Sequence, residues 1–280
     1  MSEIRACVIG HPIAHSRSPL IHKYWLAVHH IKGDYTRKDV PPEKIVAFLD
    51  QFASGPYIGA SVTVPHKEIA FRKVDEAEPV AHALGAVNTI WHKNGKLFGT
   101  STDVHGFLAN LGRSQTNWET RTKSAVILGA GGAARSVAYG LIERKIPNIL
   151  VANRTRSRAE DLAAHFKNKI KPVAMADLPA HLKDADLLVN TTSLGMTGQP
   201  PLKIDLAPLK KSAIVYEIVY APLETELLAQ ARARGNPVVD GLGMLLHQAA
   251  PAFERWFGVR PEVTSELRSL VISDLAREAK

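Results

Sequence analysis

The sequence predicts an α/β protein in which short apolar strands alternate with amphipathic helices, and three observations support this class. Short β-branched runs, such as Ala125–Leu128 and Ile149–Ala152, have the composition of buried parallel strands. Apolar residues recur at helical spacing from residue 134 to residue 142, between those two runs. A glycine-rich turn, Gly129–Ala133, joins the first strand to that helix.

The composition is that of an ordinary globular protein. Its 280 residues are 45% hydrophobic and 22% charged, which suffices for a large core in one or two domains. Cys7 is the only cysteine, so internal disulfides are excluded and a reducing compartment is indicated. Neither a signal peptide nor an apolar run of membrane-spanning length is found. We therefore expect a cytoplasmic protein without a membrane partner.

The chain is basic, with a net charge of +8 and a pI near 9.5. Most of its basic residues are scattered, and the one dense cluster is Arg154, Arg156 and Arg158. A basic surface can steer an anionic cofactor or substrate toward a protein. We expect small anionic ligands rather than nucleic acid.

The first strand, over residues 4–10, leads into a loop and then a helix. Pro19 fits a first helical position and Ser18 its N-cap. Ser16 and Ser18 can also offer two hydroxyl groups to an anion. His11 and His15 have no third ligand nearby, so no metal site is predicted.

The next segments read as a strand over 35–40, a helix over 43–52 and a strand over 58–64. Alternation in the last of these places Ser61 and Thr63 on one face. Pro65 ends the ladder, and Lys67 stands where the following helix begins. On spacing alone, Lys67 fits a surface lysine better than a site residue.

An asparagine interrupts the apolar strand predicted over 86–91. Asn88 needs hydrogen-bond partners if it is buried, so it either braces a loop or faces a ligand. Asn94-Gly95 marks the turn of a hairpin, whose return strand reaches Asp103. The simplest interpretation of Asp103 is an N-cap for the helix that follows. The polar residues 118–123 favour a linker between domains.

Strand, glycine turn, helix and second strand form the βαβ unit of a dinucleotide-binding domain. In that fold the glycines and the helix N-terminus bind the pyrophosphate, here through the segment Gly129, Ala130, Gly131, Gly132 and Ala133. The second strand ends without the acidic residue that binds the ribose of NAD. It offers phosphate-binding side chains instead, and these predict NADP(H): Asn153, Arg154, Thr155 and Arg158.

The α/β alternation continues through strands near 187–190, 213–219 and 238–239. Thr191 opens a polar loop at the carboxyl end of the first of these strands, where ligands bind in open α/β sheets. Gly235 ends a helix that begins near residue 223, and two further helices begin near residues 241 and 262.

Taken together, these motifs resemble the shikimate and quinate dehydrogenase family over essentially the whole chain. The segments that carry the resemblance are 12–19, 62–67, 85–89, 102–103, 129–133, 153–158, 220–223 and 240–248. The resemblance implies two α/β domains with the active site in the cleft. Residues 1–113 would form the substrate domain, completed by residues 241–280, and residues 114–240 a Rossmann domain. The implied reaction is the reversible NADPH-dependent reduction of 3-dehydroshikimate to shikimate, by a monomer or a homodimer.

The resemblance also assigns roles to individual residues. Lys67 and Asp103 would act at the reacting oxygen. The remaining substrate-binding residues would be Ser16, Ser18 and Tyr220 at the carboxylate, and Ser61, Thr63, Asn88 and Gln248 at the ring. Gly241 and the backbone of Ile218 would line the nicotinamide, with Thr191 also on the cofactor side.

This chain departs from the family pattern at several positions. Ser61 replaces a common Asn, Thr100-Ser101 replaces Asp-Asn, Val104 replaces Gly, and Glu217 replaces Asp. These changes leave two alternatives open. One is a paralogue that acts on quinate or prefers NAD, and the other is a non-catalytic sensor of shikimate-like ligands. A proton-transfer pair such as Lys67 and Asp103 argues against the sensor.

Overall fold

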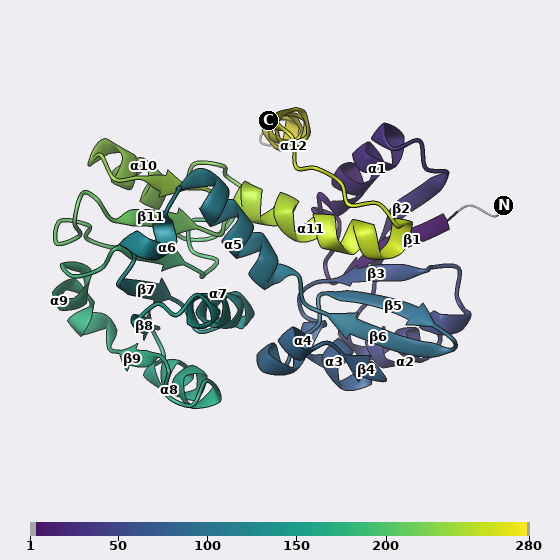
Figure 1. Cartoon of the computed structure of the whole chain (residues 1–280), viewed down its shortest axis with the longest axis horizontal. Helices are drawn as coiled ribbons and strands as arrows, with labels where there is room; N and C mark the ends of the chain where they lie inside the picture. Colours follow the sequence, from purple (N-terminus) through teal and green to yellow (C-terminus); the bar gives the residue numbers. More distant parts are fainter. Residues whose placement is uncertain (1–3, 279–280) are drawn as a thin grey trace. The chain divides into compact units, whose positions relative to one another are not determined.

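The computed structural model describes residues 4–278, and the chain forms two compact units (Figure 1). Unit 1 comprises Met1–Asp103 and Leu246–Lys280, and unit 2 comprises Val104–Leu245. Each unit contains one six-stranded sheet covered by helices. The alternation of strands and helices is thus the predicted α/β class.

Unit 1 is built on a mixed sheet with the strand order β2-β1-β3-β5-β6-β4. Its strands are β1 (Ile4–Gly10), β2 (Gly33–Asp39), β3 (Gly59–Val62), β4 (Glu76–Ala77), β5 (Thr89–Lys93) and β6 (Lys96–Thr100). Strands β1, β2 and β3 are parallel, β5 is antiparallel to β3, and β6 is antiparallel to β5. Therefore the carboxyl ends of β1, β3 and β6 meet the amino end of β5 at one edge of the sheet.

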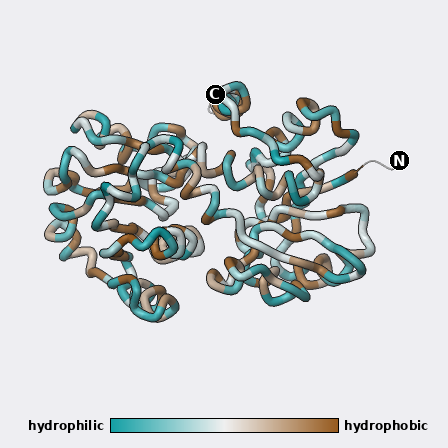
Figure 2. The backbone as a smooth tube through the Cα atoms, viewed as in Figure 1, coloured by the Kyte–Doolittle hydropathy of each residue, from teal (hydrophilic) through white to brown (hydrophobic). Residues whose placement is uncertain are grey.

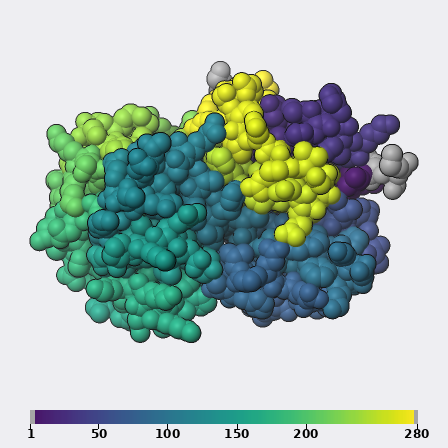
Figure 3. Space-filling view, viewed as in Figure 1, coloured from purple at the N-terminus to yellow at the C-terminus, as the bar shows by residue number. Residues whose placement is uncertain are grey.

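Helices cover both faces of this sheet. They are α1 (Ser18–Val28), α2 (Ile45–Asp50), α3 (Lys67–Lys73), α4 (Pro79–Leu84) and α12 (Ser265–Glu278), with short 3₁₀ turns at Pro42–Lys44 and Phe52–Ser54. Helix α11 (Gly241–Phe257) belongs to unit 1 from Leu246 onward. Figure 3 shows the yellow C-terminal residues lying against the purple N-terminal ones, and α12 packs on α1. Segments far apart in the sequence thus complete one unit.

Local geometry in unit 1 confirms one turn and corrects two helix caps. Asn94 and Gly95 both adopt positive φ in the turn between β5 and β6, as the predicted hairpin requires. The N-cap of α1 is Arg17 rather than Ser18, because Ser18 is already helical. Asp103 is the first residue of its helix rather than a cap, and its carboxylate is engaged elsewhere.

Unit 2 has an all-parallel sheet with the order β12-β11-β10-β7-β8-β9. Its strands are β7 (Ser124–Leu128), β8 (Asn148–Ala152), β9 (Lys171–Val173), β10 (Leu187–Asn190), β11 (Ile214–Glu217) and β12 (Val238–Val239). The order reverses between β7 and β10, which is the topology of the Rossmann fold. The predicted dinucleotide-binding architecture is therefore confirmed.

The helices of unit 2 are α5 (Asp103–Ser114), α6 (Trp118–Arg121), α7 (Gly132–Glu143), α8 (Arg156–His165), α9 (Leu178–Leu182) and α10 (Glu226–Ala233), with a 3₁₀ turn at Met175–Asp177. Fully buried strand residues such as Ile127 and Val189 form the core with α7 and α8. Figure 2 shows α8 largely in hydrophilic colours, with its apolar residues on the side of the core.

The two units divide the chain at different points from the predicted domains. Helix α5 lies in unit 2 from Val104 onward, and the division in α11 falls before Leu246. Trp118, in the predicted linker, is buried in the core of unit 2 as the start of α6. The predicted boundaries, residues 1–113 with 241–280 for the substrate domain and residues 114–240 for the Rossmann domain, stay a proposal.

Candidate active site

Lys67 is the first residue of α3, and the local fold fixes its backbone. His66 is the N-cap of the helix and is fully buried, with its ring Nε2 2.7 Å from the carbonyl of Val40. The Val87 amide donates to the carbonyl of Lys67 at 3.0 Å. The backbone of Lys67 is therefore fixed at the start of α3, and the Lys67 side chain is 29% exposed.

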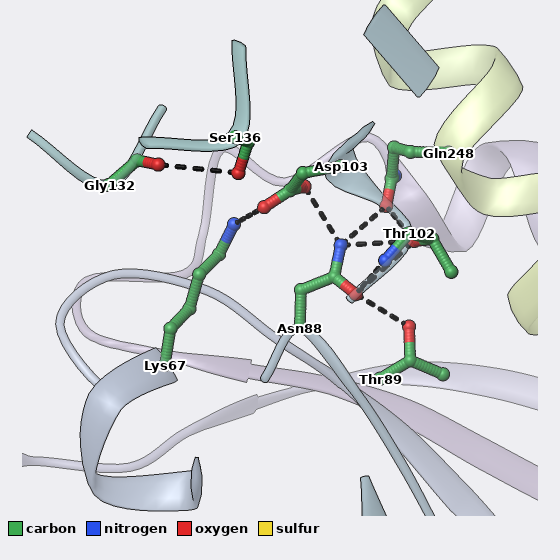
Figure 4. Close-up of polar contacts among 8 residues, drawn as sticks. All are labelled: Lys67, Asn88, Thr89, Thr102, Asp103, Gly132, Ser136 and Gln248. Atoms are coloured by element: carbon green, nitrogen blue, oxygen red, sulfur yellow. Dashed lines mark hydrogen bonds and ion pairs between the residues drawn. The ribbon is translucent and has the colours of Figure 1, made fainter. Parts of the chain in front are cut away.

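Lys67 forms an ion pair with Asp103, as Figure 4 shows. Its Nζ lies 2.5 Å from Oδ2 of Asp103, whose side chain is 14% exposed. The other carboxylate oxygen, Oδ1, accepts a hydrogen bond of 2.8 Å from Nδ2 of Asn88. The structure thus brings together the two residues predicted to act at the reacting oxygen.

Asn88 is buried and its amide is fully engaged, which satisfies the requirement for partners. Its Oδ1 accepts from the backbone of Thr102 at 2.9 Å and from the Thr89 hydroxyl at 2.8 Å. Its Nδ2 also lies 3.0 Å from Oγ1 of Thr102 and 3.4 Å from Oε1 of Gln248. Asn88 therefore orients Asp103 and connects it to Gln248 on α11 (Figure 4).

Thr102 is a site residue to which the sequence reasoning gave no role of its own. Its hydroxyl lies 3.3 Å from Oε1 of Gln248, and its side chain is buried. The signal available in the sequence was its position directly before Asp103, at the end of a strand. That signal alone does not distinguish a site residue from a helix-start threonine.

Ser16 lies in the loop before α1, and Ser18 is the first residue of that helix. Ser16 Oγ accepts from the backbone N–H of Ser18 at 3.3 Å. Arg37 donates twice to the Ser16 carbonyl, at 2.9 and 2.7 Å. Arg17, between the serines, is 2% exposed, and its Nε lies 2.7 Å from Oδ2 of Asp274 on α12. The two serines therefore flank a buried guanidinium group whose charge is paired with Asp274.

Ser61 lies near the carboxyl end of β3, Thr63 directly follows that strand, and both are half-buried. Ser61 Oγ accepts a 2.8 Å hydrogen bond from the hydroxyl of Tyr35. Burial raises the pKa of Tyr35 well above its usual value, so that hydroxyl stays a donor. The hydroxyl of Thr63 makes no hydrogen bond within residues 4–278, whereas Ser61 is already engaged.

The glycine turn of unit 2 presents bare backbone at the start of α7. Gly129 has φ of +102°, a conformation that favours glycine. Gly131 is the N-cap and Gly132 the first helical residue, and a Cβ on either would meet no atom within 4 Å. Ala130 and Ala133 flank them with small side chains. Open N–H groups at a helix N-terminus fit the pyrophosphate of a dinucleotide.

The arginine cluster stands at the end of β8 and the start of α8. Arg154 and Arg158 are exposed and form no ion pair within the described part of the chain, whereas Arg156 pairs with Glu160 at 2.8 Å. Asn153 Nδ2 donates to the carbonyl of Thr155 and so shapes the turn. Two guanidinium groups without a carboxylate partner fit a phosphate monoester, such as the 2′-phosphate of NADP(H).

The remaining predicted residues of unit 2 lie at the carboxyl ends of β10 and β11. Thr191 is buried against the glycine turn, and its hydroxyl donates to the Leu128 carbonyl at 2.6 Å. Gly241 packs so tightly on Ile218 that a Cβ there would overlap the Ile218 carbonyl. Tyr220 follows β11, whereas Ser16 and Ser18 lie in unit 1. A shared role for Tyr220 and the serines therefore stays a prediction.

Within residues 4–278, no group of three or more His, Cys, Asp or Glu side chains could hold a metal ion. No helix in that range is both long and apolar enough to cross a bilayer.

Three family models match the chain in sequence order. The shikimate dehydrogenase substrate binding domain matches residues 8–90, and the shikimate / quinate 5-dehydrogenase model matches residues 110–196. The shikimate 5′-dehydrogenase C-terminal domain matches residues 241–265. Together these models span both units.

Individual proteins show the same likeness. Shikimate dehydrogenase (NADP(+)) of Azorhizobium caulinodans is 52% identical over 276 residues, which are 99% of this chain and 98% of that protein. The Thermus thermophilus shikimate 5-dehydrogenase, solved with NADP(H) and shikimate, has a TM-score of 0.85 at 34% identity and covers 99% and 100% of the two chains. The Corynebacterium glutamicum quinate dehydrogenase, solved with NAD, has a TM-score of 0.90 at 32% identity, with 97% and 99% covered.

Proposed function

The chain belongs to the shikimate dehydrogenase family, and from this premise we propose how its residues serve the NADPH-dependent reduction of 3-dehydroshikimate to shikimate. Two of the relatives named above, from Azorhizobium caulinodans and Thermus thermophilus, are named as shikimate dehydrogenases and with NADP. We assign both to this chain as an NADP-dependent oxidoreductase. The observation that carries the residue assignment is the ion pair of Lys67 and Asp103.

We propose that this pair handles the hydroxyl proton. Hydride loss from a secondary alcohol makes its hydroxyl strongly acidic, so a nearby base must take the proton, and an acid must return it in the reverse direction. When bound, the nicotinamide accepts or supplies the hydride. Lys67 Nζ and Asp103 Oδ2 are 2.5 Å apart and partly exposed, so the pair can exchange a proton with a ligand.

We propose that the remaining polar groups of unit 1 orient the substrate. Gln248 and Asn88 are joined to Asp103 through hydrogen bonds, so hydroxyl groups that contact them are set at a fixed position relative to the pair. The hydroxyl of Thr63 makes no hydrogen bond within residues 4–278 and can serve a ligand. Ser16 and Ser18 would bind the carboxylate, beside the buried charge of Arg17.

Two features of unit 2 support NADP(H) rather than NAD(H). Strand β8 ends without an acid, and Arg154 and Arg158 carry no carboxylate partner within residues 4–278. Because the chain also resembles a quinate dehydrogenase solved with NAD, the experiment below includes quinate and NAD⁺. The 52% identical relative, however, is named for NADP(+).

Initial rates of nicotinamide reduction by the purified protein test this proposal. Shikimate and quinate are each offered with NADP⁺ and with NAD⁺. We expect shikimate with NADP⁺ to give the highest kcat/KM. A preference for quinate or NAD⁺ would show that Ser61 and the other departures redirect specificity, and binding of shikimate without turnover in any pairing would favour the sensor.

Assembly and location are part of the proposal as well. We propose a monomer or a homodimer, which sedimentation of the purified protein distinguishes. We also propose a cytoplasmic location, supported by a sole cysteine, Cys7, that is buried and unpaired.

A further inference from the structure

A buried carboxylate stands next to the backbone of Ile218, which the family resemblance places against the nicotinamide. Glu217 is the last residue of β11 and is fully buried. Asn190 Nδ2 lies 3.0 and 2.9 Å from its two oxygens, and the Val219 amide donates to Oε1 at 3.0 Å. The Thr225 hydroxyl donates to Oε2 at 3.2 Å. All these partners are donors, so the carboxylate is saturated by the protein.

The donors belong to three different elements. Asn190 is the last residue of β10, and its Oδ1 accepts from the backbone and the hydroxyl of Thr192, at 3.0 and 2.8 Å. Val219 belongs to the segment that leaves β11. Thr225 is the N-cap of α10 and accepts from the Leu228 amide. One side chain therefore ties together the ends of two neighbouring parallel strands and the start of a helix.

The contacts of Glu217 and Gly241 fix the backbone of the segment that follows β11. Gly241, at the start of α11, approaches Ile218 so closely that only a glycine fits. The backbone of Ile218 and Val219 is thus held by Gly241 on one side and by Glu217 on the other. In open α/β sheets, ligands bind in the crevice outside the carboxyl ends of such strands.

We propose that Glu217 is a positioning residue that fixes the Ile218–Val219 backbone for the nicotinamide end of NADP(H), an inference that rests on the proposed function. A purely structural role explains it less well. Burial raises the pKa of Glu217 to about 7, against the hydrogen bonds from Asn190, Val219 and Thr225 that lower it. A buried charge is weak support for stability, whereas it can specify one arrangement of its donors.

The test compares two ligands on the wild type and on Glu217→Gln. NADPH reaches both ends of the cofactor site, whereas adenosine 2′,5′-bisphosphate lacks the nicotinamide. The variant keeps the size of the side chain but turns an acceptor into a donor that faces other donors. We expect its Kd for NADPH to rise about tenfold, because a displaced Ile218–Val219 backbone would lose part of its contact with the nicotinamide end. Its Kd for the bisphosphate should stay within about twofold.

Two further variants make the comparison decisive. Glu224→Gln removes an exposed carboxylate of the same unit, which pairs with Arg232, and should change neither Kd. Glu217→Asp keeps the charge on a shorter side chain and should restore most of the NADPH affinity. If Glu217→Gln does not fold, Glu217→Asp takes its place, and a partial loss of affinity is then expected for NADPH but not for the bisphosphate.

Equal changes in both Kd values, or a lower Tm with neither Kd changed, would overturn the inference and leave Glu217 a structural residue. The proposed function fails separately. A wild type that binds NADPH but does not turn over shikimate refutes the activity, while the contrast between the two ligands still decides the role of Glu217. A wild type that binds the bisphosphate but not NADPH refutes both.

Discussion

Each of the two units contains an asparagine–carboxylate pair, and the hydrogen-bond patterns of the two pairs are closely similar. In unit 1, Asn88 donates to Asp103, and its Oδ1 accepts from a threonine hydroxyl and a threonine backbone N–H. In unit 2, Asn190 donates to Glu217, and its Oδ1 accepts from the hydroxyl and the backbone of Thr192. Both pairs lie at strand ends, where an amide can join one loop to the next.

The two pairs differ in the other groups that contact the carboxylate oxygens. Asp103 is 14% exposed, and its second oxygen forms an ion pair with Lys67, the residue that we propose to carry the proton. Glu217 is fully buried, and Asn190, a backbone amide and a threonine hydroxyl occupy its oxygens. We infer that such an asparagine–carboxylate pair can take part in proton transfer where a titratable partner and solvent remain accessible, as at Asp103. Where fixed donors replace both, as at Glu217, we infer that the pair holds the backbone in place.

Among the substitutions that test this comparison, we expect the largest effect at Lys67. Lys67→Ala removes the titratable partner, so kcat for shikimate oxidation should fall by about 10²- to 10⁴-fold, the usual contribution of general acid–base catalysis. The Kd for shikimate, measured by calorimetry, should change far less, because Asn88 and Gln248 remain. Lys73→Ala is the control, since Lys73 lies on the same helix and pairs with Asp50. Unchanged kcat in Lys67→Ala would remove this residue from the chemistry.

A second effect concerns stability against pH. Glu217 has a pKa of about 7 in the folded protein and 4.5 as its ordinary value. Below pH 4.5 both the folded and the unfolded states carry the proton. As the pH rises from 4.5 through 7, only the unfolded state loses it easily, so the free energy of unfolding should fall by about 3 kcal/mol.

Urea titrations of the wild type and Glu217→Gln between pH 4.5 and pH 8 measure this loss. The difference between the two curves should decline over that range and then level off. Glu224→Gln should keep the wild-type dependence, because an exposed carboxylate is solvated in both states. Parallel curves for the wild type and Glu217→Gln would show that this carboxylate does not titrate there.

A third effect separates the phosphate site from the site of proton transfer. Arg154→Ala should raise KM for NADP⁺ by about 10- to 100-fold, because a charge-assisted hydrogen bond to phosphate is lost. The KM for NAD⁺ should stay within about threefold, since NAD⁺ lacks the 2′-phosphate. Arg232→Ala, which removes an exposed arginine paired with Glu224, is the matched control. An equal loss for both cofactors would contradict the assignment.

The smallest effect is expected at Tyr35. Tyr35→Phe removes the donor to Ser61 and should lower the free energy of unfolding by about 1 kcal/mol, the usual worth of one neutral hydrogen bond. The KM for shikimate should change by less than about threefold, because the Ser61 hydroxyl remains available to a ligand. Tyr24→Phe on α1 is the control. A change in the ratio of shikimate to quinate turnover would instead identify Tyr35 and Ser61 as determinants of specificity.

The candidate site residues of unit 2 could be predicted from the sequence more directly than those of unit 1. The glycine turn, the helix at Gly132 and the arginines after β8 are contiguous along the chain, so spacing and residue type sufficed to predict them. In unit 1 the interacting residues are Lys67, Asn88, Asp103 and Gln248, which come from four separate segments. No periodicity links such segments, and spacing alone favoured a surface lysine and a helix cap. Only the family resemblance grouped them.

The role of Glu217 could not be predicted in the same way. It was noted only as a departure from the family pattern, because its partners Asn190 and Thr225 lie on other elements of unit 2. A carboxylate at a strand end reads equally well as a ligand contact or a solvated residue. Its full burial and its four donor contacts are properties of the assembled sheet.

The completion of unit 1 by α11 and α12 has a consequence for synthesis on the ribosome. Trp256 Nε1 donates to the Ile90 carbonyl, Trp25 Nε1 donates to the Glu262 carbonyl, and Gly59 leaves room for the Trp256 indole. These contacts form only after all of unit 2 has been translated, a delay on the order of ten seconds. Unit 2 can therefore fold on the nascent chain first, while the sheet of unit 1 waits with the apolar side chains of α1 uncovered. Lys67 and Asp103, the pair that we propose to transfer the proton, are translated before unit 2, yet we expect their site to be completed last.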